Sequence, residues 1–283
     1  MDSVLNWVGG KSLSAEKIVK LMPDHDCYVE VFGGALWIYF RKSPSKVEVV
    51  NDINGELINF YRCVQRKHKE FLERTHYEMY SRELYYEYLN DFYSGKHKEL
   101  DDVERAFRFY CLIKEAFGAK FGGGWGYSSA RNMATAFFNE FLGFDAINER
   151  LKNTQIDNRD FEEIINGYDG ERTLFYVDPP YCGSANDLYY FKCVDTSFSM
   201  WDHQRLYMAL KNIKGKFILT VDDCEWVRER YCVPDSGFTV IENEVFYSSA
   251  DKDNRRHVIE LIITNFNPNG KKHVDARQGQ LNF

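Results

Sequence analysis

Short apolar runs alternate with amphipathic stretches along the first sixty residues. Residues 28–32 and 47–50 are mostly apolar, and each run is followed by a polar or glycine-containing turn and a helical pattern. A strand, a tight turn and a helix, repeated twice, are typical of a doubly wound α/β fold with a parallel sheet. Later apolar runs predict further strands at 155–157, 173–177, 216–221 and 258–264. Helices are predicted at 202–213 and 224–231.

A segment of different character separates the two groups of strands. From about residue 62 to 150 the strand pattern gives way to charged amphipathic helices with many aromatic residues. We therefore expect a discontinuous sheet domain, residues 1–61 and 150–266, around a helical insert, residues 62–149. Residues 267–283 have no periodicity and are expected to form a flexible tail.

Composition and charge narrow the classes to which this protein can belong. With 283 residues, 44% of them apolar and 6 prolines, the chain is expected to be globular. It lacks both the run of about 18 apolar residues that a membrane-spanning helix needs and a secretory leader pattern, so we expect a cytoplasmic, intracellular protein with no membrane partner. The formal net charge of −7 argues against a protein that coats nucleic acid, but not against an enzyme with one local basic face.

The cysteines and histidines show no spacing typical of a metal site. The seven cysteines include no C-x-x-C pair, and the seven histidines include no H-x-x-x-H pair. An odd number of cysteines also argues against a disulfide framework. We therefore expect reduced thiols and no metal ion, and we interpret Cys182 as a small filler side chain.

The sharpest chemical signal is Asp178-Pro179-Pro180-Tyr181, directly after the predicted strand at 173–177. In an open parallel sheet the carboxyl ends of the strands face the ligand crevice, so a carboxylate there is well placed for binding or catalysis. The prolines fix φ and remove backbone donors. A carboxylate, the Pro179 carbonyl and an aromatic ring together can hold an exocyclic amine and stack on its heterocycle. The alternative is a strand that ends in a proline turn with a solvated aspartate.

Five segments stand out along the chain: residues 6–11, 30–34, 51–54, 160–161 and 178–181. In these segments, and in their order, the sequence resembles the Dam-type DNA adenine-N6 methyltransferases, also called the D12 class. The likeness extends from Leu5 to Phe266. It implies a Rossmann-like S-adenosylmethionine-dependent methyltransferase sheet, with 178–181 as the catalytic motif and the helical insert as a target-recognition domain. Leu36 stands where many members have the second glycine of F-x-G-x-G, which leaves the path of that loop open.

The resemblance implies S-adenosyl-L-methionine as the cofactor. In relatives the W-x-G-G-K element contacts the cofactor, the F-x-G loop passes under its methionine moiety, an aspartate corresponding to Asp52 holds the ribose, and a D-F pair frames the adenine. The chemistry of the residues agrees, because glycines allow close backbone approach and Asp52 has the spacing of a ribose-binding acid. Helix capping is the alternative role for Asp52 and Asp160. The cofactor candidates are Trp7, Gly9, Gly10, Lys11, Phe32, Gly33, Gly34, Asp52, Asp160, Phe161 and Asp178.

The resemblance also implies duplex DNA as the partner, and hence association with the nucleoid. Adenine N6 is paired inside a duplex, so the base must be extruded into the pocket, where Tyr181 and Phe161 would replace the lost stacking. Solvated surface is the alternative for each candidate DNA contact. These candidates are Lys114, Lys120, Trp125, Tyr127, Arg131, Arg255 and Arg256. The last residues, Gln280 to Phe283, are faintly similar to peptides that dock on sliding clamps, a match short enough to be accidental.

Two other functions fit the same residues. The amine can belong to cytosine N4, to adenine in RNA or to a protein glutamine, since the motif chemistry accepts all three. The chain can also be a non-catalytic module that keeps a cofactor pocket for regulation. The intact motif 178–181 argues against this second alternative.

Overall fold

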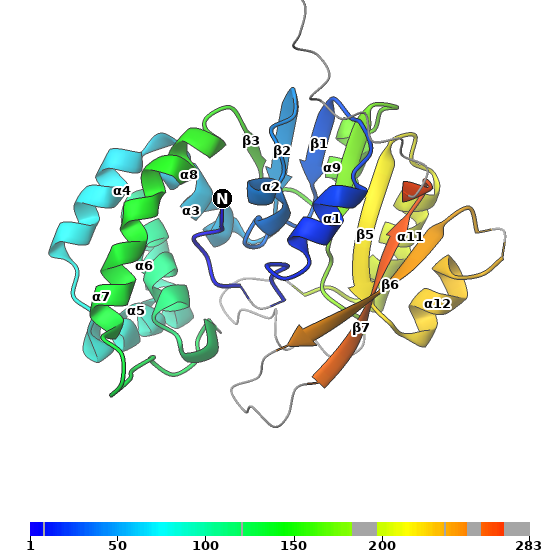
Figure 1. Cartoon of the computed structure of the whole chain (residues 1–283). Helices are drawn as coiled ribbons and strands as arrows, with labels where there is room; N and C mark the ends of the chain where they lie inside the picture. Colours follow the sequence, from blue (N-terminus) through cyan, green and yellow to red (C-terminus); the bar gives the residue numbers. More distant parts are fainter. Residues whose placement is uncertain (8, 120, 183–196, 235, 248–255, 269–283) are drawn as a thin grey trace, which may run out of the picture.

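The computed structural model describes the chain except for residues 8, 120, 183–196, 235, 248–255 and 269–283 (Figure 1). The described strands form one sheet in the order β3-β2-β1-β4-β5-β7-β6. Their bounds are β1 Cys27–Glu30, β2 Val47–Asn51, β3 Gln155–Asp157, β4 Thr173–Val177, β5 Lys216–Asp222, β6 Thr239–Tyr247 and β7 Arg256–Thr264. Strands β1 to β5 pair in parallel, which confirms the predicted α/β sheet.

The last two strands depart from the expected parallel arrangement. β7 pairs with β5 in the antiparallel direction, and β6 pairs antiparallel with β7 at the edge of the sheet. A parallel neighbour needs a long crossover connection, whereas antiparallel strands can be joined directly. β6 itself was not predicted, because its polar residues, such as Glu242 and Asn243, interrupt the apolar run.

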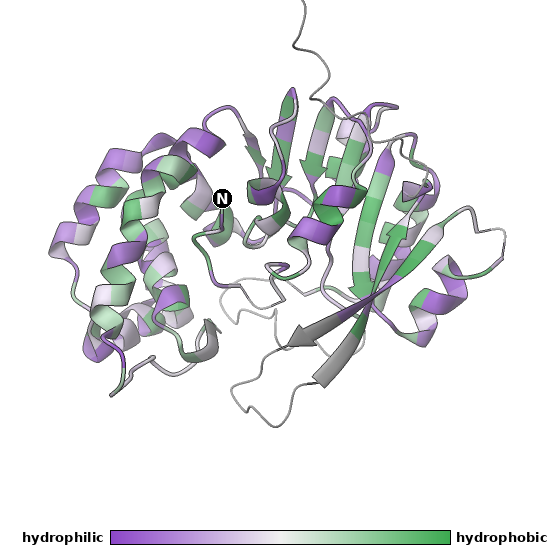
Figure 2. Cartoon of the chain, viewed as in Figure 1, coloured by the Kyte–Doolittle hydropathy of each residue, from purple (hydrophilic) through white to green (hydrophobic). Residues whose placement is uncertain are grey.

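The two faces of the sheet bury different side chains. Along β4, Leu174 and Tyr176 belong to one apolar core, and Phe175 and Val177 belong to the other. This alternation follows from the two-residue period of a strand and explains why the central strands are continuous apolar runs. Figure 2 shows hydrophobic strands at the centre of the sheet domain, between helices whose outer surfaces are largely hydrophilic.

Helices cover both faces of the sheet. Residues of α1, α2 and α3 pack into the first core, and residues of α9, α11 and α12 pack into the second. The helix bounds are α1 Ala15–Leu21, α2 Trp37–Arg41, α3 Gly55–Arg66, α4 His68–Arg74, α5 Arg82–Ser94, α6 Asp102–Lys114, α7 Met133–Glu140, α8 Phe144–Leu151, α9 Phe161–Tyr168, α11 Met200–Lys211 and α12 Glu225–Tyr231. Within the described residues, no helix is long and apolar enough to cross a membrane.

The helices from α4 to α8 form a group beside the sheet (Figure 1, left). Aromatic rings fill its interior and its contact with α3: Phe71 stacks on Phe144 with ring centroids 5.4 Å apart, and Phe60 of α3 stacks on Tyr110 at 5.6 Å. Such pairs contribute about 0.5–1.5 kcal/mol beyond the burial of their area. These rings are continuous with the first core, so the helical group is packed onto the same side of the sheet as α1 to α3.

Candidate active site

A pocket opens where β1, β2 and β4 end. Glu30 is the last residue of β1, while Asp52 and Asp178 directly follow β2 and β4, and all three line the pocket. This is the position that the parallel-sheet argument predicts for a ligand. The structure brings most of the predicted catalytic and cofactor-binding residues together here. The predicted residues that line the pocket are Trp7, Gly9, Gly10, Lys11, Phe32, Gly33, Gly34, Asp52, Asp178 and Pro180.

Two side chains hold the Asp178 carboxylate in place. Thr220 Oγ1 on the neighbouring strand β5 donates a hydrogen bond to Asp178 Oδ1 at 2.8 Å, and Tyr176 Oη lies 3.0 Å from the same hydroxyl. The Lys11 ammonium lies 2.9 Å from Asp178 Oδ1. Burial raises the pKa of Asp178, and the charge of Lys11 opposes that rise. Lys11 therefore favours the ionised form that can accept hydrogen bonds from an amine.

Lys11 is the centre of a buried polar network. Its ammonium donates to the hydroxyl of Tyr181 at 2.8 Å and lies 3.6 Å from Glu260 Oε1. The side chain of Lys11 is only 4% exposed, and that of Glu260 is fully buried on β7. Each of these charges would be costly to bury alone, so the network stabilises both. It joins the amino-terminal segment, the motif 178–181 and the last described strand.

The glycine loop after β1 has a shape that side chains would obstruct. Gly34 has φ +48°, and a Cβ there would lie 3.2 Å from the Trp7 ring. The amide of Gly34 donates to Asp52 Oδ2 at 2.9 Å, and the amide of Asn54 donates to Asp52 Oδ1 at 2.8 Å. Asp52 thus fixes the loop beside the pocket, and burial raises its pKa.

The backbone of Leu36 shows the path of the loop that the sequence left open. It has φ +55° and is the one non-glycine residue with positive φ in the described part of the chain. Its amide donates to the Gly33 carbonyl at 2.8 Å, and its side chain is buried. Leu36 therefore adopts a left-handed conformation that glycine favours, at the position where the sequence motif predicts a glycine.

Glu30 is a pocket residue that the sequence analysis missed. Its Oε2 accepts hydrogen bonds from the Tyr28 hydroxyl at 2.7 Å and from the Tyr39 amide at 2.9 Å. Burial raises the pKa of Glu30 to about 8, and the charge of Asp178 adds to the rise. A charged residue inside the apolar run 28–32 was the available signal, because an isolated acid in a buried strand needs a partner.

Asp160 and Phe161 lie beside the pocket lining rather than in it. Asp160 caps α9 by accepting from the Glu162 amide, and Arg205 Nη2 lies 2.7 Å from its Oδ1. Phe161 is buried, with its ring 5.8 Å from that of Phe32, which does line the pocket. In this structure Asp160 serves as the helix cap that the sequence analysis kept as the alternative.

Trp125, Tyr127 and Arg131 share one surface depression on the helical group. Tyr127 is 71% exposed and stacks with Trp125 at a centroid distance of 6.2 Å. The guanidinium of Arg82 lies 5.1 Å and 5.2 Å from the centroids of these two rings. Arg82 was not predicted, because its contact with residues more than forty positions away is visible only in the fold.

The other candidate DNA contacts are placed differently. The side chain of Lys114 is 5% exposed and its ammonium pairs with Glu140, so contact with a phosphate requires this ion pair to break. Lys120 and Arg255 lie outside the described residues. Arg256 begins β7, but its side chain is likewise not described.

The sequence as a whole matches one family. A family model described as D12 class N6 adenine-specific DNA methyltransferase matches residues 7–249. The chain belongs to this family. The match covers the pocket and residues 178–181, and it confirms the family that the sequence motifs indicated.

Curated relatives of this methyltransferase support the same assignment. A type II methyltransferase of Lactococcus lactis subsp. cremoris is 25% identical over 277 residues, which cover 92% of this chain and 94% of the relative. A type II methyltransferase of Paramecium bursaria Chlorella virus NC1A is 26% identical, covering 82% of this chain and 86% of the relative. The DNA adenine methylase of Escherichia coli K12 is 30% identical over 117 residues, 40% of each chain.

The family implies S-adenosylmethionine as the methyl donor, and the pocket of this methyltransferase fits its chemistry. A Cβ at Gly10 would lie 2.9 Å from Nε1 of Trp37. Glycine therefore allows the backbone to pass close to the indole ring in the pocket wall. The Asp178 carboxylate suits the cationic groups of the donor, and Lys11 suits its carboxylate. The aromatic and apolar lining suits its adenine.

Proposed function

We propose that this chain transfers a methyl group from S-adenosylmethionine to N6 of an adenine in duplex DNA, with the motif 178–181 holding the amine. The observation that supports this most is the placement of Asp178, fixed by Thr220 and Lys11 at the rim of a pocket that also carries the glycine loop. A carboxylate fixed in this way is already oriented before the amine arrives.

The residues of the motif act mainly by orientation and charge. When bound, S-adenosylmethionine supplies the methyl group from its sulfonium, and the C–S electron pair stays on sulfur as the N–C bond forms. Asp178 and the Pro179 carbonyl accept hydrogen bonds from the N6 amine, which frees the nitrogen lone pair. Asp178 also stabilises the positive charge that develops on nitrogen until a proton leaves to solvent. The positive charge of Lys11 favours the ionised form of Asp178 that this task needs.

The target base must leave the duplex to reach Asp178. Tyr181, whose hydroxyl contacts Lys11 and Glu260, would stack on the extruded base, with Phe161 beside Phe32 as a further apolar surface. Stacking of this kind contributes about 1–3 kcal/mol per base. As a protein that acts on DNA, the chain would work inside the cell, at the nucleoid.

We assign target recognition to the helical insert. Arg82, Trp125, Tyr127 and Arg131 form the surface that we propose contacts DNA, because it combines exposed aromatic faces with cationic side chains. Residues 280–283, with their faint similarity to sliding-clamp peptides, lie outside the described residues.

The test is transfer of labelled methyl groups from S-adenosylmethionine to duplex DNA, followed by chromatography of the nucleosides. We expect N6-methyldeoxyadenosine as the product. Asp178→Asn should lower the rate by at least about 100-fold, the loss typical of removing one preorganised electrostatic partner. Asp223→Asn is the matched control, because Asp223 pairs with Arg228 and does not line the pocket.

Three other results would contradict the proposal. Methylated cytosine, or methylation of RNA alone, would assign the chemistry to another amine. Cofactor binding without transfer to any substrate would indicate a regulatory module. Equal rates for Asp178→Asn and Asp223→Asn would remove Asp178 from the mechanism.

A further inference from the structure

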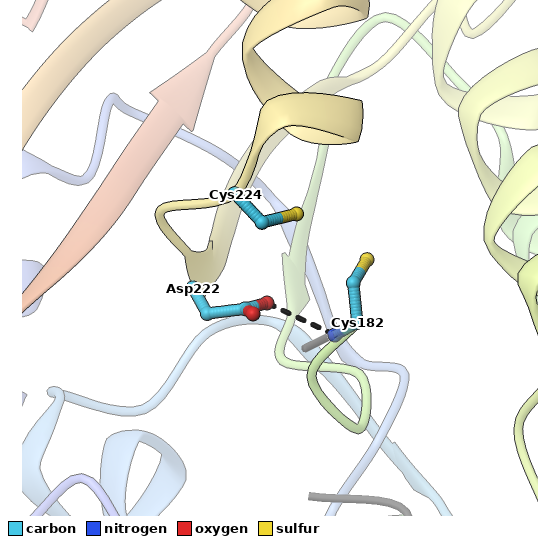
Figure 3. Close-up of side chains that lie close together, drawn as sticks. All are labelled: Cys182, Asp222 and Cys224. Carbon is cyan, nitrogen blue, oxygen red and sulfur yellow. Dashed lines mark hydrogen bonds between the residues drawn. The ribbon is translucent and has the colours of Figure 1, made fainter. Parts of the chain in front are cut away.

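Three potential metal ligands converge next to the end of the motif 178–181. Cys182 follows Tyr181, Asp222 ends β5, and Cys224 immediately precedes α12. The two sulfur atoms and one carboxylate oxygen all lie within 4.8 Å of one another. Figure 3 shows the two thiol groups and the carboxylate gathered at one place, where the Cys182 amide donates to Asp222 Oδ1 at 3.0 Å.

We propose that Cys182, Asp222 and Cys224 bind a zinc ion that fastens the catalytic loop to the end of β5. Sulfur and carboxylate donors are those that Zn²⁺ accepts, with Zn–S bonds of about 2.3 Å. Two sulfurs bound tetrahedrally at that length lie about 3.8 Å apart, so donors within 4.8 Å need only a small closure to meet one ion.

The combination of donors favours a cation over a disulfide bond. A disulfide would use the two sulfurs alone, whereas a carboxylate oxygen of Asp222 lies within 4.8 Å of both sulfurs and can join them as a third ligand. A divalent cation uses all three groups and offsets the repulsion between a carboxylate and two thiolates. The sequence spacing gave no sign of this site, because Cys182 and Cys224 come from separate loops that only the neighbouring strands β4 and β5 bring together.

A nitrogen ligand is available in the same region. His203 on α11 is 4% exposed, and its Nε2 is buried without a hydrogen-bond partner among the described residues. Its ring lies 5.8 Å from that of Trp226, two residues after Cys224. His203 or a water molecule would complete the four ligands that zinc usually takes.

A zinc ion here would hold the loop with the motif 178–181 in place and would take no part in methyl transfer. Cys182 is covalently next to Tyr181, whose hydroxyl contacts Lys11. Fixing Cys182 to Asp222 and Cys224 therefore restrains the loop that carries the amine-binding motif. The metal site does not depend on which base is methylated, so its test is independent of the proposed function.

The experiment measures zinc on the full-length protein. Protein purified under reducing conditions is equilibrated with ZnCl₂ and freed of excess metal. Its zinc content per chain is then measured by elemental mass spectrometry. We expect about one Zn²⁺ per chain. Loss of a residue that only hydrogen-bonds to a metal ligand weakens metal affinity by about 10–100-fold. Cys182→Ser and Cys224→Ser each remove a ligand itself, so each should weaken zinc affinity by more than this. Co²⁺ in place of Zn²⁺ should give a thiolate-to-cobalt absorption band that both variants lose.

Cys232→Ser is the matched control, because Cys232 lies at the other end of α12 and outside the cluster. It should bind zinc like the unmodified chain, and circular dichroism should show that all three variants are folded. His203→Ala distinguishes the fourth ligand, since it weakens binding only if the imidazole coordinates. The proposal is overturned if the unmodified chain binds no zinc, if Cys182→Ser and Cys224→Ser bind it as tightly as Cys232→Ser, or if air oxidation yields a Cys182–Cys224 disulfide while no metal binds.

Discussion

The hydroxyl of Tyr181 donates a hydrogen bond to Oε1 of Glu260 at 2.5 Å. Tyr181 belongs to the motif 178–181 after β4, whereas Glu260 lies on the antiparallel strand β7, two strands away in the sheet. The contact reaches across β5, where Asp222 pairs with Glu260 in the strand register. Glu260 touches Lys11 as well, so it is a positioning residue for the whole network.

Glu260→Gln should move the acid limb of the activity profile to lower pH. The negative charge of Glu260 raises the pKa of Asp178, and glutamine removes that charge while its amide oxygen can still accept from Tyr181. Asp178 then ionises at lower pH, so methyl transfer persists further into acid. The measurement is kcat/KM between about pH 5 and 8, which reports the ionisation of the free enzyme.

Glu244→Gln is the control for this shift, because Glu244 lies exposed on the edge strand β6. Its profile should coincide with that of the unmodified chain. Glu260→Ala should lose the Tyr181 contact in addition to the charge and should therefore be slower than Glu260→Gln. An acid limb that stays in place in Glu260→Gln would show that Glu260 does not act on Asp178.

Lys11→Met should destabilise the fold by about 3 kcal/mol, because it leaves two carboxylates near each other in the interior without their cation. The loss should be larger at about pH 8 than at about pH 5. Without Lys11 the pKa of Asp178 rises further in the folded state. A group with a raised folded-state pKa favours folding at low pH and loses that contribution as pH rises.

Urea unfolding of Lys11→Met at the two pH values measures this difference. Lys20→Met is the control, since Lys20 forms an exposed ion pair with Glu16 and should change stability by no more than about 0.5 kcal/mol. A pH-independent loss in Lys11→Met would mean that packing, and not charge, explains its stability effect.

Much of the site could be predicted from the sequence because its residues follow strands. Asp52 and Asp178 come directly after apolar runs, and the carboxyl ends of parallel strands meet at one edge. Thr220 and Glu260 escaped prediction because they lie inside strands, where only the register of β4, β5 and β7 shows which side chains meet. The left-handed backbone of Leu36 could not be predicted either, because leucine rarely adopts this conformation.

Glu30→Gln should make the free energy of unfolding less dependent on pH. The pKa of Glu30 is raised to about 8 by burial, so between its ordinary value of 4.5 and about 8 the unfolded chain is ionised there while the folded chain is not. Folding stability falls with rising pH across that window, by at most about 1.4 kcal/mol per pH unit. The amide oxygen of glutamine can accept from both Tyr28 and Tyr39, so the fold should keep these contacts.

The measurement for Glu30→Gln is unfolding by urea at about pH 5 and pH 8. Relative to the unmodified chain, the variant should gain stability as the pH rises. Glu30→Ala should be less stable than Glu30→Gln at both values, because it leaves the Tyr28 hydroxyl and the Tyr39 amide without their acceptor. A constant difference between Glu30→Gln and the unmodified chain would place the ionisation of Glu30 outside this window.

Gly34→Ala should impair binding of S-adenosylmethionine more than it impairs folding. Its Cβ would meet the Trp7 ring at 3.2 Å, in a backbone conformation with φ +48° that costs alanine about 1–2 kcal/mol. Because Trp7 and Gly34 both line the pocket, relief of the contact must change the pocket wall. Gly167→Ala is the matched control: Gly167 lies within α9 with open space around its Cβ, so alanine should stabilise the fold by about 0.5–1 kcal/mol and leave cofactor affinity unchanged. Calorimetric titration with S-adenosylmethionine, beside thermal unfolding, separates the two effects, and equal cofactor affinity in both variants would remove the glycine loop from the binding site.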